Sequence, residues 1–514
     1  MTKILWADDE IDLLKPHILL LRKKGYDVTT VASGPDALDA LDAEDFDIVF
    51  LDEMMPGLSG LETLNRINLS HPDVPVVMIT KSEEEDIMNQ AIGNKIADYL
   101  IKPVNPAQIL LSLKKNLQSA RLVSEHTNSG YQQDFARLSM LINDARSIED
   151  WYEIYRQLVY WEINLSEGDN AMAEMILMQK REANSNFSKF IPRVYEDWIQ
   201  TQEHPLMSHE LFKKCIFPLR DEGQKVALIV IDNFRLDQWR AIQPLLADDF
   251  VAREELYTAI LPTTTQFARN SIFAGLLPLK IKEMFPSLWV DNSSDEESLN
   301  DHESELIASQ LERYRRKDTF VYNKVRTSEQ IEHQIRALGS SARKDIFVLV
   351  VNFIDMLSHS GTESRMMREL AGTDAAYRSL TESWFRHSPI LDLFRQLAHF
   401  GYKIILTTDH GTIRVDNPVK IVGTRDLNTN LRYKAGRNLS YNARQVFSLT
   451  NPAKCGLPVP SLSSEYVFTT NNDFFTYPNR YNEFVKLYTG TFQHGGISLE
   501  EMLIPLVTLT PRQQ

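Results

Sequence analysis

The stretch "YKIILTTDHGTIRV", residues 402–415, decides the fold of the larger part of this chain. Its apolar run, 404–406, is typical of a strand that is buried on both faces of a sheet. The strand ends just before Asp409 and His410, although a buried carboxylate without a partner is costly. We therefore expect a parallel sheet whose carboxyl edge carries a polar site, because ligands bind at that edge in such folds.

Two other apolar runs have the same character: "KVALIVIDNFRLD" (225–237) and "DIFVLVVNFIDMLSH" (345–359). Helical patterns separate the three runs, which predicts a large α/β domain over 211–514. Polar side chains end each run, and a further histidine follows near the end of the chain: Asp232, Asp355, His359, Asp409, His410 and His494. Three carboxylates and three imidazoles suit two borderline metal ions, most simply two Zn²⁺.

A hydrolase of this design needs a nucleophile, and "LPTTTQFARNSIFAGLLP" (261–278) offers three hydroxyls before an expected helix. The negative charge of a metal-bound threonine alkoxide near a helix N-terminus would be stabilised both by the metal ion and by the helix dipole. Two metal ions about 4 Å apart would bind both oxygens of an in-line displacement at phosphorus. The residues by themselves leave open which threonine acts.

Residues 3–117 alternate short apolar runs with amphipathic stretches, which predicts a flavodoxin-like (βα)5 fold with five helices around a parallel sheet. The expected strands are 3–7, 27–32, 47–51, 74–80 and 97–101. The side chains at the carboxyl ends of these strands include Asp8, Asp9, Asp52, Thr80 and Lys102. Acids that share a shallow pocket would hold a hard cation such as Mg²⁺, and Asp52 would then accept a phosphoryl group.

The middle of the chain lacks strand patterns. The polar stretch 124–133 has no periodicity and predicts a linker after a last helix over about 106–117. Ser147 and Asp150 are typical of a helix start, and apolar residues then recur at helical spacing. We expect a helical bundle over 121–210 that connects or spaces its neighbours.

Composition narrows the class of protein. The 514 residues carry a net charge of −15, which disfavours tight nonspecific binding to duplex nucleic acid. The sequence shows no signal peptide and no apolar run long enough to span a bilayer, so we expect a cytoplasmic protein without membrane insertion. Its two cysteines, Cys215 and Cys455, are expected to be free thiols. No basic helix-turn-helix follows the first domain, so sequence-specific DNA binding is not expected.

The segment "TRDLNTNLRYKAGRNLSYNAR" (424–444) is rich in basic residues. Its cations lie near Tyr433 and Tyr441 and are Arg425, Arg432, Lys434, Arg437 and Arg444. One interpretation is a solvated basic loop. The other is a substrate-binding surface in which Arg432, Lys434 and Arg437 contact phosphates and the rings stack on bases, as in proteins that bind single-stranded nucleic acid.

The first domain resembles the receiver domain of bacterial response regulators through "DDE", "LDEMMPGLSG", the threonine at 80 and "KP" at 102–103. The resemblance implies that Asp52 is the phosphoacceptor and that a sensor histidine kinase is the phosphodonor. It also implies one Mg²⁺ and dimerisation on phosphorylation. The implied Mg²⁺ ligands and switch residues are Asp8, Asp9, Asp52, the Met54 carbonyl, Thr80, Tyr99 and Lys102.

The last domain resembles the alkaline phosphatase superfamily, and "HGGISLEEMLIPL" with "PTTTQFARNSIFAGLLP" is similar to its PglZ branch. The resemblance implies one Zn²⁺ on Asp232, Thr265, Asp409 and His410, and another on Asp355, His359 and His494. It implies that Thr265 is the nucleophile, with Thr264 as the alternative, and that Arg269 or Asn270 holds a nonbridging oxygen. A third metal site has no counterpart, which favours a diesterase.

The order of receiver (1–120), helical segment (121–210) and PglZ-like domain (211–514) resembles response regulators of the type IX secretion system. We therefore expect a response regulator with a zinc-dependent phosphodiesterase output, directed at oligonucleotides, that controls secretion. The alternative is an adaptor whose metal-bound PglZ-like domain binds partners without turnover. A secretion-system or sigma-factor protein is a possible partner in either case.

Overall fold

The computed structural model describes the chain except residues 1, 72–73, 82–95, 166–169, 291–298, 342, 364, 424–427, 460–462 and 513–514. The chain divides into two compact units, Met1–Gly130 and Tyr131–Gln514. Within the described residues, no helix combines the length and the apolar character that a bilayer span requires.

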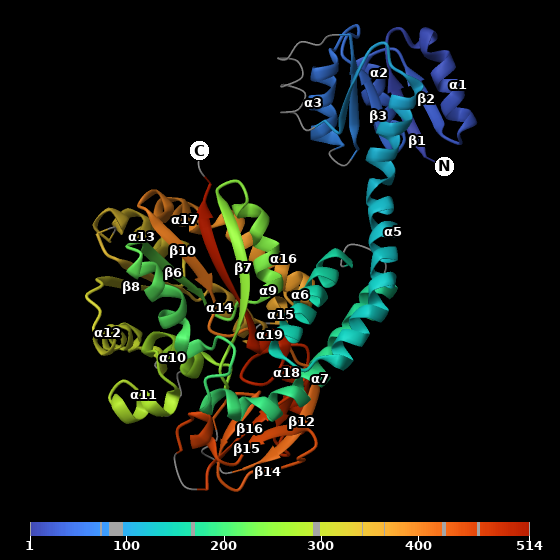
Figure 1. Cartoon of the computed structure of the whole chain (residues 1–514). Coiled ribbons are helices and arrows are strands. Elements are labelled where there is room, and N and C mark those ends of the chain that lie inside the picture. Colours follow the sequence, from blue (N-terminus) through green and yellow to red (C-terminus); the bar gives the residue numbers. More distant parts are fainter. Residues whose placement is uncertain are drawn as a thin grey trace. The chain divides into compact units, whose positions relative to one another are not determined.

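The first unit is a five-stranded parallel sheet in the order β2-β1-β3-β4-β5 (Figure 1). The strands are β1 Lys3–Ala7, β2 Asp27–Val31, β3 Ile48–Asp52, β4 Val76–Thr80 and β5 Asp98–Ile101. The described helices that precede β4 are α1 Lys15–Lys23, α2 Gly34–Ala43 and α3 Gly60–Ser70. Along β1, Ile4 and Trp6 enter one hydrophobic cluster while Leu5 and Ala7 enter another, so the sheet is covered on both faces. This confirms the predicted flavodoxin-like fold; the expected fourth helix lies outside the described residues.

The predicted linker at 124–133 is wrong. One helix, α5, runs without interruption over Pro106–Asp144. No proline interrupts this stretch, and adding a residue to an existing helix is much easier than starting a new one. The helix therefore continues from one amphipathic end to the other, although the polar stretch between them has no helical periodicity.

The helices of the middle segment pack against the larger domain. They are α6 Ile148–Leu165 and α7 Asn170–Gln200, and their apolar residues belong to the same hydrophobic cluster as the core of that domain. The predicted helix start is confirmed, because the Asp150 amide donates to Ser147 Oγ at 3.2 Å and the Ser147 amide donates to Asp150 Oδ2 at 2.9 Å.

A buried ion network also joins these two helices to the larger domain. The Lys180 ammonium of α7 lies 2.9 Å from Glu162 of α6 and 3.1 Å from Glu500. Arg378 connects Glu162 to Asp237, with Nη1 3.1 Å from the first carboxylate and 3.2 Å from the second. The helices are thus part of one body with the domain that follows.

The larger domain is built on a six-stranded sheet in the order β7-β19-β10-β6-β9-β8. Its strands are β6 Lys225–Ile231, β7 Phe250–Thr258, β8 Phe320–Val325, β9 Ile346–Val351, β10 Tyr402–Thr407 and β19 Leu503–Pro511. The strands β10, β6, β9 and β8 are parallel, whereas β19 runs antiparallel to both β10 and β7. The three apolar runs of the sequence are the central strands β6, β9 and β10, as predicted.

Helices cover the faces of this sheet, and three small sheets follow β10. The described α-helices of this domain, of which α18 packs against β17 of a small sheet, are α8 Phe217–Asp221, α9 Leu236–Ile242, α10 Asn270–Ala274, α11 Pro278–Met284, α12 Glu303–Arg313, α13 Ser328–Ser341, α14 Phe353–Glu363, α15 Arg365–Leu370, α16 Asp374–His387, α17 Ile390–His399, α18 Tyr481–Tyr488 and α19 Leu499–Met502. The first small sheet consists of β11 Ile413–Arg414 and β18 Phe492–Gln493. The second consists of β12 Asn417–Val422, β14 Ser440–Tyr441 and β17 Asp473–Thr476. The third consists of β13 Tyr433–Gly436, β15 Val446–Leu449 and β16 Glu465–Thr469.

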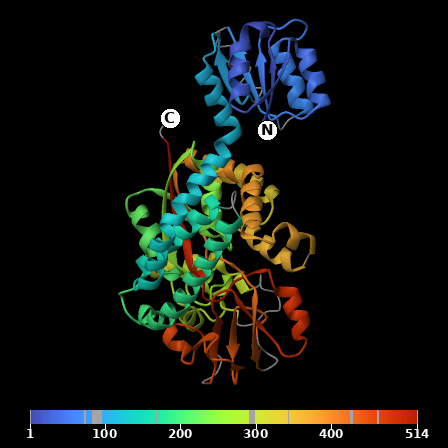
Figure 2. The same ribbon diagram turned by 90° about the vertical axis from the view of Figure 1, so that its right-hand side faces the viewer.

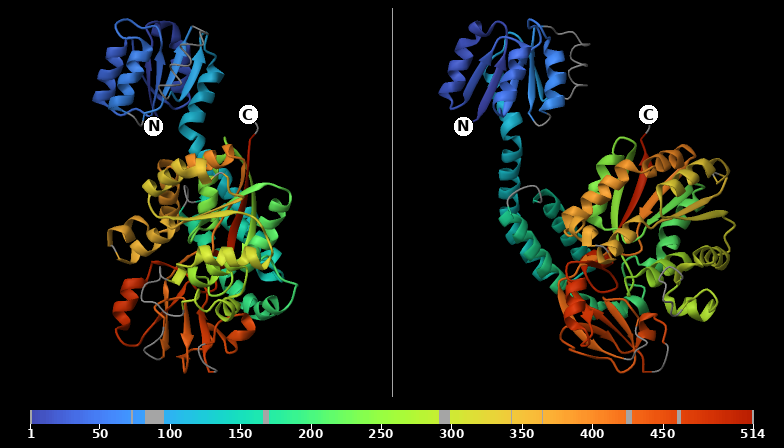
Figure 3. Two further views of the ribbon diagram at one scale, coloured as in Figure 1. Left: turned by 90° about the vertical axis from the view of Figure 1, so that its left-hand side faces the viewer. Right: turned by 180° about the vertical axis from the view of Figure 1, so that it is seen from behind.

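The small sheets, orange to red in Figures 2 and 3, lie at the end of the large sheet opposite to the C-terminal end of β19. Because β19 is antiparallel to β10, this is the carboxyl edge of the parallel strands. The edge at which the sequence predicts a polar site is therefore bordered by the small sheets.

Candidate metal centres

An acidic pocket lies at the carboxyl edge of the sheet in the first unit. Asp8 follows β1 and Asp52 ends β3, and each offers, together with Asp9, one oxygen within 4.8 Å of the others. The Lys102 ammonium lies 2.7 Å from Asp8 Oδ2 and 3.0 Å from Asp52 Oδ1. Three carboxylates with one such ammonium keep an excess of negative charge, which fits a hard divalent cation such as Mg²⁺.

The other predicted receiver residues come from β4, from β5 and from the loop that follows β3. Burial raises the pKa of the Asp52 carboxyl to about 6, although the hydrogen bond from Lys102 opposes that rise. Thr80 is buried at the end of β4 and shares a hydrogen bond with the Tyr99 hydroxyl. The Met54 side chain is exposed, and the predicted ligand at this position is its backbone carbonyl.

The six carboxylates and imidazoles among the seven residues predicted to bind zinc come together at the carboxyl edge of the large sheet. They follow β6, lie in the first turns of α14, follow β10 and follow β18: Asp232, Asp355, His359, Asp409, His410 and His494. They form two groups of three, and within each group one ligand atom per residue lies within 4.8 Å of the others. We call Asp232, Asp409 and His410 the inner cluster, and Asp355, His359 and His494 the outer cluster.

The inner cluster is completely enclosed. His410 Nε2 lies 3.8 Å from Asp232 Oδ1 and 3.7 Å from Asp409 Oδ2, and all three side chains are at most 1% exposed. His410 Nδ1 lies 3.1 Å from the Gly411 carbonyl, which must accept a hydrogen bond from a protonated Nδ1. Nε2 therefore keeps its lone pair, as a metal ligand requires.

Thr265 adds a hydroxyl to the inner cluster. Its Oγ1 lies 3.1 Å from His410 Nε2 and 3.3 Å from Asp232 Oδ1. The neighbouring Thr264 Oγ1 is buried and has no hydrogen-bond partner among the described residues. The geometry therefore places Thr265, not Thr264, beside the cluster.

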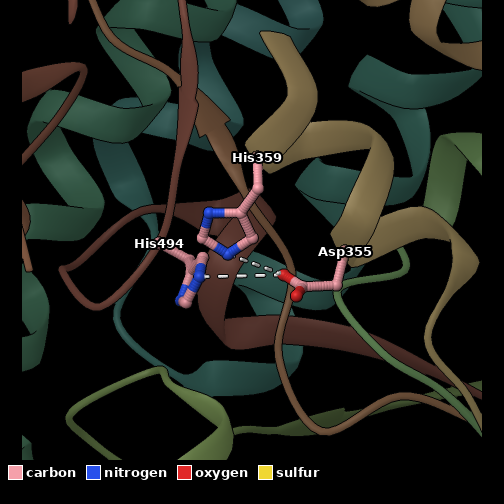
Figure 4. Close-up of side chains that lie close together, drawn as sticks. All are labelled: Asp355, His359 and His494. Atoms are coloured by element: carbon pink, nitrogen blue, oxygen red, sulfur yellow. Dashed lines mark ion pairs between the residues drawn. The ribbon is translucent and has the colours of Figure 1, made fainter. Parts of the chain in front are cut away.

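The outer cluster is more open. Asp355 and His359 stand one turn apart on α14, with 3.4 Å between Asp355 Oδ1 and His359 Nε2 (Figure 4). His494 Nε2 lies 3.9 Å from the same oxygen, and the His359 side chain is 47% exposed. Burial would raise the pKa of Asp355, but His359 and His494 hold it below its ordinary value. The His410 and His494 rings stack with centroids 4.3 Å apart, so the two clusters are adjacent.

The two clusters fit two borderline cations. Asp409 Oδ2 is buried and accepts no hydrogen bond from the described residues. Burial beside Asp232 raises the pKa of Asp409 well above its ordinary value, whereas burial lowers that of His410. Carboxylates that repel one another and a neutral imidazole form a donor set that Zn²⁺ or a similar ion would stabilise.

The structure gives Arg269 a different role from the predicted one. Its Nη1 lies 2.5 Å from Asp232 Oδ2 and its Nε lies 2.5 Å from Glu303, all of them buried. The guanidinium thus orients Asp232, leaving Oδ1 to face Thr265 and His410. Asn270 accepts a 3.0 Å hydrogen bond from Asn300 and is also buried, so neither residue is free to hold a phosphate oxygen as placed. Sequence reasoning missed Glu303, because only the fold brings it to Arg269.

Two of the cations predicted to bind substrate are buried and not at the surface. Arg432 is buried in an ion pair with Glu501, and their closest atoms lie 2.5 Å apart. Lys434 is buried and donates to the Asn428 carbonyl at 2.7 Å. Arg437 is exposed, while Arg425 lies outside the described residues. A phosphate-binding surface made of Arg432 and Lys434 is therefore wrong, because neither side chain reaches solvent.

Three family models match the chain. The model described as BREX system PglZ alkaline phosphatase-like domain matches residues 211–509. The model described as PorX response regulator linker domain matches residues 121–199, and the response regulator receiver domain matches residues 4–114. The three segments follow one another in the predicted order.

Similar proteins match part of the chain. Sensory transduction protein RegX3 of Mycobacterium tuberculosis is 34% identical over 120 residues, which are 23% of this chain and 52% of that protein. The alkaline phosphatase synthesis transcriptional regulatory protein PhoP of Bacillus subtilis is 29% identical over 155 residues, 30% of this chain and 63% of that one. The structure of response regulator DrrB from Thermotoga maritima is 32% identical over 23% of this chain and 53% of that chain, with a TM-score of 0.22. The chain spans about half the length of the curated relatives it matches.

Proposed function

This chain belongs to the family of BREX system PglZ alkaline phosphatase-like domains, and on that premise we propose that its second unit hydrolyses phosphodiesters with two Zn²⁺ ions. The observation that carries the proposal is the position of the Thr265 hydroxyl, within 3.3 Å of both His410 and Asp232. A nucleophile beside one cluster of ligands and next to a second cluster is the arrangement that two-metal phosphoryl transfer needs.

Each cluster would hold one ion, with Thr265 completing the inner set. When bound, the two ions supply positive charge to the attacking and leaving oxygens and to the transferred phosphoryl group. Thr265 Oγ1 loses its proton and attacks phosphorus as the bond to the leaving alkoxide breaks, and the alkoxide takes up a proton and leaves as an alcohol. The product is a phosphothreonine that still carries the second ester group. Water then cleaves the phosphothreonine bond, releases the phosphomonoester and restores the hydroxyl. Arg269 keeps Asp232 Oδ1 directed at the inner cluster while Oδ2 is occupied.

A phosphodiester suits the site better than a phosphomonoester. In the described part of the second unit, the possible metal-binding groups are the two clusters, with no third group beside them. A monoester dianion brings one more charge to neutralise than a diester monoanion does. The two-cluster site thus supports diester hydrolysis. The expectation of oligonucleotide substrates stays a prediction, and its sequence basis is weaker now that Arg432 and Lys434 are known to be buried.

The receiver domain implies a phosphodonor kinase, and we propose that a sensor histidine kinase phosphorylates Asp52 with one Mg²⁺ in the acidic pocket. The match of residues 121–199 to the PorX response regulator linker domain supports the resemblance to regulators of type IX secretion. Control of that system by the phosphorylated chain, as a homodimer, is the proposed biological role. The added phosphate carries about two negative charges, which pair with Lys102 and draw Thr80 inward.

The test is hydrolysis by the purified full chain loaded with Zn²⁺. The substrates are an aryl phosphodiester, the matching aryl phosphomonoester and a short single-stranded oligonucleotide. We expect turnover of the diester above the monoester, and loss of turnover in His410→Ala and His359→Ala. A chain that binds two Zn²⁺ but turns over none of the three would overturn the enzyme proposal, and phosphorylation-dependent binding of a partner would then favour the adaptor.

A further inference from the structure

Asn233 connects the two clusters. It directly follows the inner-cluster residue Asp232, is 0% exposed, and has a backbone φ of 64°. Its Nδ2 donates to Asp355 Oδ1 of the outer cluster at 3.2 Å and to Ser358 Oγ at 3.0 Å. Asparagine enters the left-handed region more readily than most side chains. Of two consecutive residues, Asp232 therefore belongs to the inner cluster and Asn233 contacts the outer one.

The oxygen that Asn233 contacts is the one at the centre of the outer cluster. Asp355 Oδ1 lies 3.4 Å from His359 Nε2 and 3.9 Å from His494 Nε2. The second partner, Ser358, donates its hydroxyl to the Asp355 backbone carbonyl at 2.7 Å. One amide group thus holds both the carboxylate and the first turn of the helix that carries it.

We propose that Asn233 is a positioning residue that fixes the outer metal site at a set distance from the inner one. The inference rests on the proposed function only in taking the clusters as metal sites. Its physical basis is that a ligand held in a fixed orientation loses less entropy when a metal ion binds. Loss of a hydrogen bond to a metal ligand typically lowers metal affinity about 10–100-fold.

The experiment is a titration of the metal-free full chain with Co²⁺, followed by its visible absorption, and with Zn²⁺ against a competing chelator. The test variant is Asn233→Gly, because glycine accepts the positive φ and the change removes the side chain that contacts Asp355 and Ser358. The matched control is Asn438→Gly, because Asn438 also has a positive φ, 54°, but is exposed between β13 and β14 and belongs to neither cluster. Asn233→Ala adds backbone strain to the loss of the amide, and Ser358→Ala removes only the second partner.

We expect two metal equivalents in the wild type, and in Asn233→Gly one affinity lowered about 10–100-fold and the other unchanged. His359→Ala identifies which step belongs to the outer cluster. Unchanged affinities in Asn233→Gly, or equal weakening of both, would overturn the inference, as would a wild type that takes up fewer than two equivalents. If the titration behaves as expected and no phosphoester is hydrolysed, Asn233 keeps its role and the proposed function fails.

Discussion

The Thr265 hydroxyl lies 3.1 Å from His410 Nε2, at the edge of the enclosed inner cluster. Because this hydroxyl is the proposed nucleophile, Thr265→Ala should lower diester hydrolysis by at least about 1,000-fold. Thr265→Ser should keep part of the activity, since it retains the hydroxyl. Thr264→Ala is the matched control and should remain active. Loss of turnover in the control, with retention in Thr265→Ala, would move the nucleophile to Thr264.

The metal content gives the most direct check of the clusters. Elemental analysis of the purified chain should find two zinc equivalents, and one in His410→Ala or His359→Ala. His387→Ala, an exposed histidine outside both clusters, should keep two. Zinc contents that do not differ among the three variants would mean that the metal binds elsewhere.

Phosphorylation of Asp52 should depend on Lys102, which contacts that carboxylate at 3.0 Å. Lys102→Met removes a charge-assisted hydrogen bond worth about 1.5–3 kcal/mol, so the rate of labelling by a small phosphodonor with Mg²⁺ should fall about 10–100-fold. The control is Lys115→Met, because Lys115 pairs with Asp98 in a more exposed position. Equal labelling of both variants would show that Lys102 does not contribute to phosphorylation of Asp52.

The buried Lys434 predicts a dependence of stability on pH. Burial lowers its pKa from 10.5 to about 7. Between these values the unfolded chain binds the proton and the folded chain does not, so the free energy of unfolding rises with pH across this window and is level below it. Relative to the wild type, Lys434→Met should be more stable at pH 7 by a few kcal/mol, and the difference should shrink towards pH 10. Denaturant unfolding at several pH values measures this, and parallel curves for the two proteins would contradict it.

The regular parts of the fold are predictable because their signals are local. The apolar runs before Asp232 and Asp409 identify central strands, and Asp355 with His359 four residues later identifies a helical turn. The order of these elements along the chain is enough to bring the two clusters together, because parallel strands place their carboxyl ends at one edge.

Residues whose role depends on a distant partner are not predictable in this way. Arg269 and Arg432 read as free cations, but each is neutralised by a glutamate, Glu303 or Glu501, that lies 34 or 69 residues away in the sequence. The role of Asn233 could not be predicted from the sequence, because its left-handed backbone conformation decides which side chains its amide reaches. The continuous α5 was missed since helix propagation does not require periodicity.

The shared core of the middle helices and the following domain sets a limit on how the chain can be divided. A fragment cut at residue 211 would include every residue of both clusters and the whole PglZ match. It would also expose the faces that α6 and α7 cover, and would leave Glu500 without the ammonium of Lys180. The family match therefore begins later than the folded unit, and the smallest fragment that keeps this core intact should begin near Tyr131.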